Sequence, residues 1–208
     1  MQIPPSLEPI SQMRLAIPQR EFGAYIFDCD GTLVDSMPLH LRAWRASFEV
    51  HGAPFVFQES RFYARAGVPD RAIVAELNQE HGCDLDADSV HEVKLAWFIA
   101  HLQELQPVEA VAEIVRSLFG RKPMAVASGS DLALVEPELI HVGLRSCFEI
   151  IITPADVKRG KPAPDMFLLA AERMGVAPEQ CLVFEDGQAG LDAAKAAGME
   201  TVFVPSAP

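Results

Sequence analysis

Two acidic residues, Asp28 and Asp30, stand one residue apart between the apolar run 24–27 and Gly31. Side chains two positions apart on an extended chain point to the same side, so both carboxylates can share a metal ion or act on one substrate. Gly31 permits the sharp change of direction that a Cβ atom would hinder. A calcium loop also contains D-x-D-G, but residues 32–34 supply no further series of oxygen ligands. The alternative to a catalytic pair is a strand end with solvated acids.

Small hydroxyl residues and a lysine follow two later apolar runs in the same way. Ser128-Gly129-Ser130 comes after the run 124–127, and its hydroxyl and backbone N–H groups suit phosphoryl oxygens. Lys161 follows the run 149–152 and precedes a helical pattern, where its charge can neutralise a phosphate and a nucleophile together. Taken alone, the first segment also fits a helix-capping turn and the second a solvated surface lysine.

Two more acids, Glu185 and Asp186, stand at the end of the apolar run 181–184. Burying acids at such a position is costly unless a cation accompanies them. Because the carboxyl ends of parallel strands lie at one edge of a sheet, we expect these acids near Asp28 and Lys161. The order and position of the four segments favour one phosphate site.

The elements that must position these residues are short strands alternating with helices. Strands are predicted at residues 24–27, 124–127, 149–152, 181–184 and 201–204. Their shortness, β-branched content and lack of alternation suit strands that are buried on both faces. Helical patterns cover residues 111–118, 167–174 and 191–197, and Gly198 marks the end of the last. This alternation predicts an α/β fold with an open, doubly wound parallel sheet.

One long segment, residues 38–106, breaks the alternation because it holds several helical patterns and no convincing strand. We expect an inserted all-helical cap there, with the core formed by residues 22–37 and 107–208. An insertion after the first strand sits at the carboxyl edge of the sheet, where open α/β folds bind ligands. Residues 1–21 carry several prolines and predict an irregular N-terminal arm.

Within the predicted cap, two tryptophans occur at helical spacing with other apolar residues. Trp44 and Trp97 are therefore expected in the apolar core of the cap rather than as sugar platforms. A capping box is predicted at residues 89–92, and Val90, Val93 and Trp97 are predicted to share the buried face of the helix that follows.

Composition and charge restrict the classes of partner. The chain has 208 residues, half of them apolar, which suffices for a globular core, and its formal net charge of -12 argues against a nucleic-acid partner. Its four cysteines form no C-x-x-C pair, which favours reduced thiols in the cytoplasm. We expect neither a secretion signal nor a membrane span. The oligomeric state is not indicated.

These segments resemble the motifs of the haloacid dehalogenase-like hydrolases, in order and at ordinary spacing. The four matching motifs are Asp28-x-Asp30-Gly31-Thr32, Ser128, Lys161 and Glu185-Asp186. The resemblance covers nearly all of the chain from Phe22 onward and implies a Rossmann-like core with a helical cap. The segments Leu33-Val34-Asp35-Ser36, Lys161-Pro162-Ala163-Pro164-Asp165 and Phe184-Glu185-Asp186-Gly187 resemble the β-phosphoglucomutase-like branch, and sugar-phosphate phosphatases, including those for fructose 1-phosphate, look most similar. Gly187 departs from the branch, in which serine is common.

The resemblance implies a role for each motif residue. Asp28 would attack phosphorus and form an aspartyl-phosphate, and Asp30 would act as general acid and base, a task that suits a raised pKa. Mg²⁺ would be held by the Asp28 carboxylate, the Asp30 main-chain carbonyl and Asp186, in keeping with its preference for oxygen ligands. Ser128 and Lys161 would bind the phosphoryl oxygens.

Two residues of the cap, His40 and Arg65, are candidates for substrate contact. By the resemblance, His40 stands at the cap entrance, where a histidine can meet the acid-base aspartate, and Arg65 stands near the loop that sets specificity. The plain alternatives are a partly exposed helix histidine and a surface arginine.

The sequence thus predicts a Mg²⁺-dependent phosphatase acting on a small phosphorylated metabolite, with a sugar phosphate favoured. A hexose-phosphate mutase is the main alternative, because it uses the same aspartyl-phosphate and differs in how the cap excludes water. Dehalogenation is disfavoured by the metal set, and a non-catalytic binding protein is disfavoured by the intact Asp28.

Overall fold

The computed structural model describes residues 15–65 and 68–205 and contains a five-stranded parallel sheet. The strands are β1 (Ala24–Phe27), β2 (Met124–Ala127), β3 (Ile150–Ile152), β4 (Cys181–Glu185) and β5 (Glu200–Phe203), and they lie in the order β3-β2-β1-β4-β5. The predicted strands are confirmed, with shifts of one residue at some ends. Since the chain moves outward from β1 on one side and then returns to its other side, β1 is central and the sheet is doubly wound.

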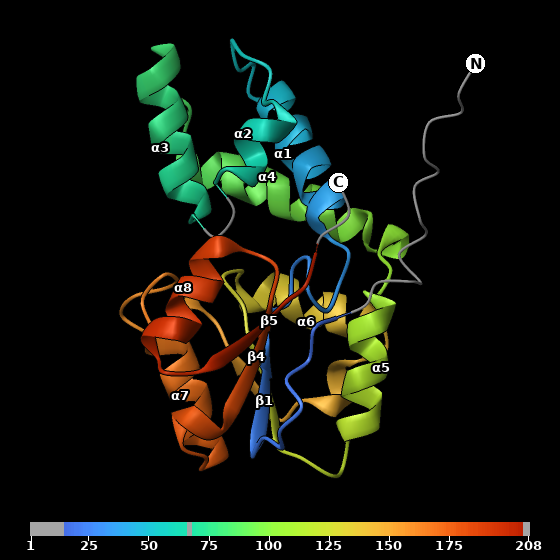
Figure 1. Ribbon diagram of the computed structural model, residues 1–208. Coiled ribbons are helices and arrows are strands. Elements are labelled where there is room, and N and C mark those ends of the chain that lie inside the picture. The colour runs from blue at the N-terminus through green and yellow to red at the C-terminus, as the bar shows by residue number, and fades with distance from the viewer. Residues whose placement is uncertain (1–14, 66–67, 206–208) are drawn as a thin grey trace, which may run out of the picture.

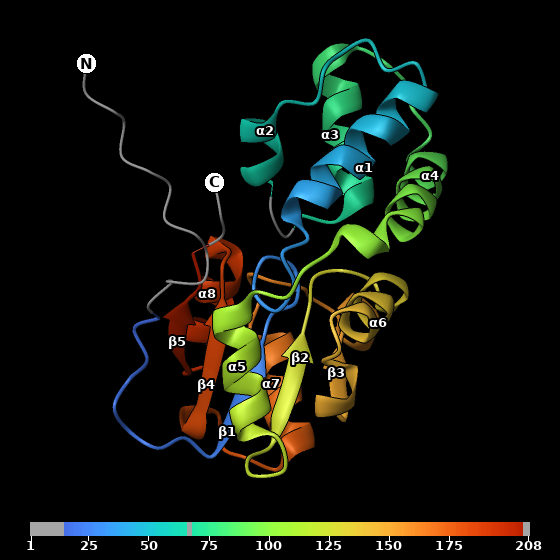
Figure 2. The ribbon, with the colours of Figure 1, turned by 90° about the vertical axis from the view of Figure 1, so that its right-hand side faces the viewer.

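Helices cover both faces of this sheet (Figure 2). The helices are α5 (Glu109–Leu118), α6 (Leu132–His141), α7 (Asp165–Met174) and α8 (Gln188–Ala196), with short 3-10 turns at Arg145–Cys147, Pro154–Asp156 and Pro178–Gln180. One apolar cluster joins the sheet to α5 and α6, and a second joins it to α7 and α8. Neighbouring residues of a strand belong to different clusters, because their side chains point to opposite faces of the sheet. Phe27 stacks on Phe184 in the first cluster, while Ile26 belongs to the second. This burial on both faces explains the unbroken apolar runs.

A group of helices lies beyond the carboxyl ends of the strands (Figure 1). It consists of α1 (Met37–Val50), α2 (Glu59–Tyr63), α3 (Asp70–His81) and α4 (Ala87–Ala100), followed by a 3-10 turn at Leu102–Glu104. These helices surround an apolar cluster of their own that includes Trp44, Phe48, Phe57 and Leu77. Trp44 is buried there, as predicted, whereas Trp97 is only partly buried and packs against the cluster under α5 and α6.

Helix α4 differs from its prediction at the start and along its buried face. Asp86 caps the helix by accepting a hydrogen bond from the Ser89 N–H (2.7 Å), so the predicted capping box at residues 89–92 is wrong. The buried line is Val90, Lys94 and Phe98 rather than Val90, Val93 and Trp97. Lysine is tolerated on that face because its methylene stem packs like an apolar side chain and its ammonium group has a carboxylate partner.

Two connections between the sheet and these helices run side by side. Val34 bridges both to Asp30 and to Pro107, and the Asp35 N–H donates to the carbonyl of Gln106. These contacts hold both connections near the end of β1. Of the predicted N-terminal arm, residues 1–14 lie outside the described residues, and residues 15–21 contain no helix or strand. Among the described residues, no helix has both the length and the apolar character needed to cross a membrane.

Candidate active site

The side chain of Asp28 lies at the centre of the carboxyl edge of the sheet, directly after β1. Its backbone N–H donates to the carbonyl of Phe184, which continues the ladder with β4, and its carboxylate is buried. Lys161 donates to Asp28 Oδ1 (2.6 Å) and to Glu185 Oε2 (2.7 Å). Lys161 therefore joins the tips of β1 and β4, although it lies far from both in sequence.

Glycines make room for the two acids at the end of β4, Glu185 and Asp186. A Cβ atom on Gly31 would lie 2.2 Å from Asp186 Oδ2, and the φ of +78° is itself unfavourable for any other residue. A Cβ atom on Gly190 would lie 2.0 Å from Glu185 Oε2. Glu185 also accepts a hydrogen bond from the Gly187 N–H (3.0 Å). The close approach of backbone and carboxylates thus depends on glycine at two positions.

This part of the site holds more negative charge than its own cation can balance. Oxygens of Asp28, Glu185 and Asp186 lie within 4.8 Å of one another, and Lys161 is the one cation that contacts them among the described residues. Burial, together with the charge of Glu185, raises the pKa of Asp28 well above its usual value and that of Asp186 to about 7. The excess of two negative charges and the oxygen-only donor set fit one Mg²⁺ ion.

Three donors surround the carboxylate of Asp30. Ser36 and His40 contact Oδ1 at 2.6 Å and 2.7 Å, and Ser130 donates to Oδ2 at 2.6 Å. Burial acts to raise the pKa of Asp30, but His40, Ser130 and Ser36 outweigh it and hold the pKa well below its usual range. The expectation of a raised pKa for Asp30 is therefore wrong in this arrangement, because hydrogen bonds favour its ionised form.

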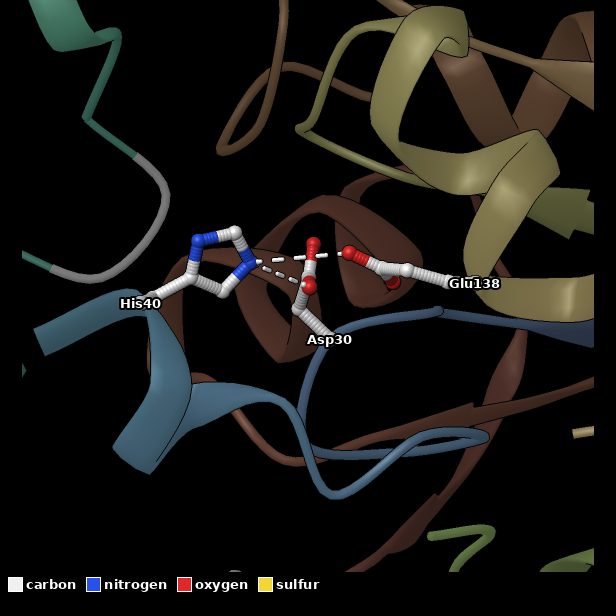
Figure 3. A group of neighbouring side chains, drawn as sticks. All are labelled: Asp30, His40 and Glu138. Carbon is white, nitrogen blue, oxygen red and sulfur yellow. Dashed lines mark hydrogen bonds and ion pairs between the residues drawn. The ribbon is translucent and has the colours of Figure 1, made fainter. Parts of the chain in front are cut away.

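The Nε2 atom of His40 faces Asp30 and, beyond it, a second buried acid, Glu138 of α6 (Figure 3). Its ring stacks on Phe98 with centroids 4.2 Å apart, and its Nε2 atom lies 3.8 Å from Glu138 Oε1. Glu138 is fully buried, and Oε1 has no hydrogen-bond partner among the described residues. Burial, followed by the charge of Asp30, raises the pKa of Glu138 well above its usual value. This shift favours the neutral form of Glu138, whose carboxyl group faces His40 and Asp30.

The segment after β2 contributes through two of its three residues. Gly129 and Ser130 line the cavity, whereas Ser128 is fully buried and absent from its lining. The Ser128 hydroxyl accepts a hydrogen bond from the Ser130 N–H (3.0 Å). Ser128 therefore shapes the turn that presents Ser130 to Asp30, and its predicted contact with phosphate remains a prediction.

The cavity has a volume of about 290 Å³ and lies between the strand tips and helices α1, α3 and α4. Its core side is lined by Asp28, Asp30, Lys161, Glu185 and Asp186. The opposite side, named the cap side after the predicted cap, is lined by Trp44, Arg65, Asp70, His91 and Lys94, among others. Both predicted cap residues, His40 and Arg65, reach the cavity, but they are occupied differently: His40 contacts Asp30, while Arg65 donates to Glu76 (3.1 Å).

Several residues in or next to the cavity were not identified from the sequence. Glu138 lies behind the cavity lining, beside Pro137 inside α6, where an acidic residue is usually expected at the surface. Asp70 and Lys94 come from different cap helices and meet only through helix packing. One signal was present for Ser130, which follows Ser128 at the tip of β2, but its partner Asp30 could not be assigned without the fold.

Known proteins resemble this chain in sequence and in structure. Residues 22–198 match the family model described as haloacid dehalogenase-like hydrolase. The fructose-1-phosphate phosphatase YqaB of Escherichia coli (strain K12) is 41% identical over 184 residues, which span 88% of this chain and 96% of that protein.

Among solved structures, CbbY from Rhodobacter sphaeroides in complex with phosphate has a TM-score of 0.79 at 27% identity, covering 86% of this chain and 84% of that chain. A β-phosphoglucomutase from Clostridium difficile shares the fold, with a TM-score of 0.73 at 24% identity over 86% of this chain and 83% of that chain. The family model spans most of the chain and includes the strand tips described above. The chain therefore belongs to the haloacid dehalogenase-like hydrolases.

Proposed function

We propose that this chain is a Mg²⁺-dependent phosphatase that hydrolyses a small sugar phosphate through an aspartyl-phosphate on Asp28. The observation that carries the proposal is the Asp28 carboxylate, which faces the cavity with Lys161 fixed 2.6 Å from it. The similarity to a fructose-1-phosphate phosphatase over 88% of the chain supports the substrate class. Residues 38–106 act as the cap in this proposal, and residues 22–37 and 107–208 as the core.

Asp28 is the nucleophile in the first step, in which its oxygen bonds to phosphorus and the alcohol leaves. Lys161 fixes the orientation of the carboxylate and offsets its repulsion of the phosphate. Forming this covalent intermediate divides one difficult displacement into two easier ones. Gly129 and Ser130 border the cavity, and because the Ser130 N–H is bonded to the Ser128 hydroxyl, the backbone N–H of Gly129 is the one offered to the phosphoryl oxygens.

Asp30 transfers the protons in both steps. Because three donors hold it as a carboxylate, it is set to accept a proton from the water that hydrolyses the intermediate. The proton that Asp30 takes from this water is the one that it gives to the leaving oxygen in the next turnover, and while Asp30 carries that proton one of these hydrogen bonds is lost. His40, whose ring stacks on Phe98 and whose Nε2 atom lies 3.8 Å from Glu138, is the positioning residue for these proton transfers.

Asp28, Asp186 and the main-chain carbonyl of Asp30 would hold the Mg²⁺ ion. The ion supplies positive charge that stabilises the crowded carboxylates and the transferring phosphoryl group. Glu185 contacts Lys161 and the Gly187 N–H instead, so it acts by holding that lysine in place.

All four cysteines are free thiols, which supports a reducing, cytoplasmic setting.

The test is phosphate release from fructose 1-phosphate, other sugar phosphates and an aryl phosphate, with and without Mg²⁺. We expect release that requires Mg²⁺ and stops in excess chelator. A hexose-phosphate mutase would instead produce isomerised hexose phosphate, so isomer formation is measured in the same reactions. Full activity in chelator, or isomerisation without phosphate release, would overturn the proposal.

A further inference from the structure

The cap side of the cavity carries cations, but each of them already has a carboxylate partner. Lys94 donates to both oxygens of Asp70, at 2.9 Å and 2.7 Å. Arg65 pairs with Glu76, and Arg71 pairs with Asp88. A phosphate that approached this wall would therefore meet no uncompensated positive charge on these side chains.

The Lys94–Asp70 pair differs from the two arginine pairs in burial. The Lys94 side chain is 6% exposed and that of Asp70 is 21% exposed, whereas the Arg71–Asp88 pair is mostly in solvent. Opening a buried ion pair leaves a charge without compensation and is strongly unfavourable, while an exposed pair opens easily. Lys94 is thus committed to Asp70, and Asp70 presents a fixed negative charge to the cavity.

A neutral hydroxyl group suits this wall better than a phosphate does. A carboxylate accepts about four hydrogen bonds, and among the described residues Asp70 receives two from Lys94 and shares one with His91 (3.0 Å). An acceptor with spare capacity of this kind matches the hydroxyl groups of a sugar or a sugar alcohol.

We propose that Asp70, Lys94 and His91 form a hydroxyl-binding wall for the leaving group, so that the enzyme accepts monophosphates of neutral polyhydroxylated compounds and rejects bisphosphates. This inference rests on the proposed function and narrows its substrate class. It also disfavours a mutase, because exchange of phosphate between two positions passes through a bisphosphate whose second phosphate would face Asp70.

The first test compares fructose 1-phosphate with fructose 1,6-bisphosphate as substrates of the unaltered protein. Like charges placed together discriminate strongly, so we expect kcat/KM for the monophosphate to exceed that for the bisphosphate by about 100-fold. Equal or inverted values would overturn the inference, including the case in which Arg65 releases Glu76 to bind the second phosphate. Hydrolysis of an aryl phosphate in parallel separates the two proposals, since its absence would reject the phosphatase itself.

The second test changes the charge of the wall. Asp70→Asn keeps an oxygen acceptor for hydroxyl groups and leaves Lys94 without its anion, so we expect the monophosphate preference to fall about tenfold. Asp84→Asn is the matched control, because Asp84 is exposed and outside the cavity lining. If folded Asp70→Asn protein prefers the monophosphate as strongly as the unaltered protein does, Asp70 is not part of the hydroxyl-binding wall. If that variant does not fold, the comparison in the unaltered protein still decides.

Discussion

The two sides of the cavity differ in charge balance: negative charge is in excess on the core side, whereas the charges on the cap side are paired. On the core side, Asp28, Glu185 and Asp186 crowd around Lys161, so negative charge is in excess. On the cap side, Lys94 is matched by the two oxygens of Asp70. An unbalanced cluster is suited to a divalent cation and a phosphoryl group, whereas a balanced pair is suited to a neutral part of the substrate.

The difference predicts opposite responses to the same kind of substitution. Removing a negative charge from the core cluster relieves repulsion in the metal-free protein, and removing one from the cap pair leaves a buried cation alone. Substitutions of carboxylates by amides on the two sides therefore test the comparison directly.

The largest effect is expected for Asp28→Asn. Loss of the nucleophile should lower kcat by about 10⁴-fold or more, as is usual when a covalent catalyst is removed. The fold should persist, because asparagine has nearly the same shape as aspartate. The substitution also removes a carboxylate whose charged form is disfavoured by burial, as its raised pKa indicates. Steady-state phosphate release and circular dichroism measure the two outcomes. Near-normal turnover in this variant would mean that another group attacks phosphorus.

Asp186→Asn should stabilise the metal-free protein. The pKa of Asp186 is raised to about 7 by burial and Glu185, so the folded state holds this proton more tightly than the unfolded state does. Stability from this group is lost as pH rises from about 4 to 7, and the amide restores about 2 to 4 kcal/mol at pH 8. Urea unfolding in chelator measures the gain. The same variant should lose the stabilisation that Mg²⁺ gives the unaltered protein.

Asp70→Asn should change the free energy of unfolding in the opposite direction, by destabilising the folded protein. Burial favours the neutral acid, but Lys94 and His91 hold the pKa of Asp70 down to about 2. The carboxylate therefore stabilises the fold above pH 4, and this contribution disappears as pH falls from about 4 to 2. We expect a loss of about 2 kcal/mol at pH 7 that shrinks below pH 4. Urea unfolding across this pH range measures the loss, with Asp84→Asn as the control. Equal changes in the free energy of unfolding for both variants would contradict the comparison.

A smaller effect is expected for Glu138, which contacts His40 at 3.8 Å and lies outside the cavity lining. Glu138→Leu should lower kcat about tenfold with KM almost unchanged, because His40 and Asp30 lose a polar neighbour that fixes their geometry. Glu138→Gln keeps the shape and a hydrogen-bonding group and should retain most of the activity. Equal loss in both variants would indicate a role other than positioning.

The smallest effect is expected at the start of α8. Gly187 occupies the N-cap position and offers no side chain to the first turn. Gly187→Ser should add a capping hydroxyl and raise the free energy of unfolding by a few tenths of a kcal/mol, about 0.3. Thermal unfolding detects such a change. Because the nearest Glu185 oxygen lies 3.3 Å from the new Cβ position, activity should be retained.

The core side was predictable from the sequence because its residues follow buried strands. Asp28 and Glu185 stand at the ends of apolar runs, and parallel strands bring such ends together whatever lies between them. The sheet, the helices on both faces and the helical segment between β1 and β2 followed from the same periodicities. The side-chain partners of Asp30, and hence the direction of its pKa shift, required coordinates, and so did the burial of Ser128 behind the cavity lining.

The cap side was not predictable because its polar pairs depend on helix packing. Lys94 occupies the position between Val90 and Phe98 on the buried face of α4, where the sequence favours an apolar residue. Its partner Asp70 begins α3, and no local pattern links the two. Glu138 is similar: its burial depends on where α6 meets His40, which is set by tertiary structure.

The most direct test of the central claim is to locate the phosphoryl group during turnover. Acid quenching of the enzyme with a radiolabelled sugar phosphate, followed by peptide mapping, identifies the residue that carries it. We predict label on the peptide that contains Asp28, formed in the presence of Mg²⁺ and absent in Asp28→Asn. Label on any other residue, or turnover with no labelled intermediate on Asp28, would contradict the account.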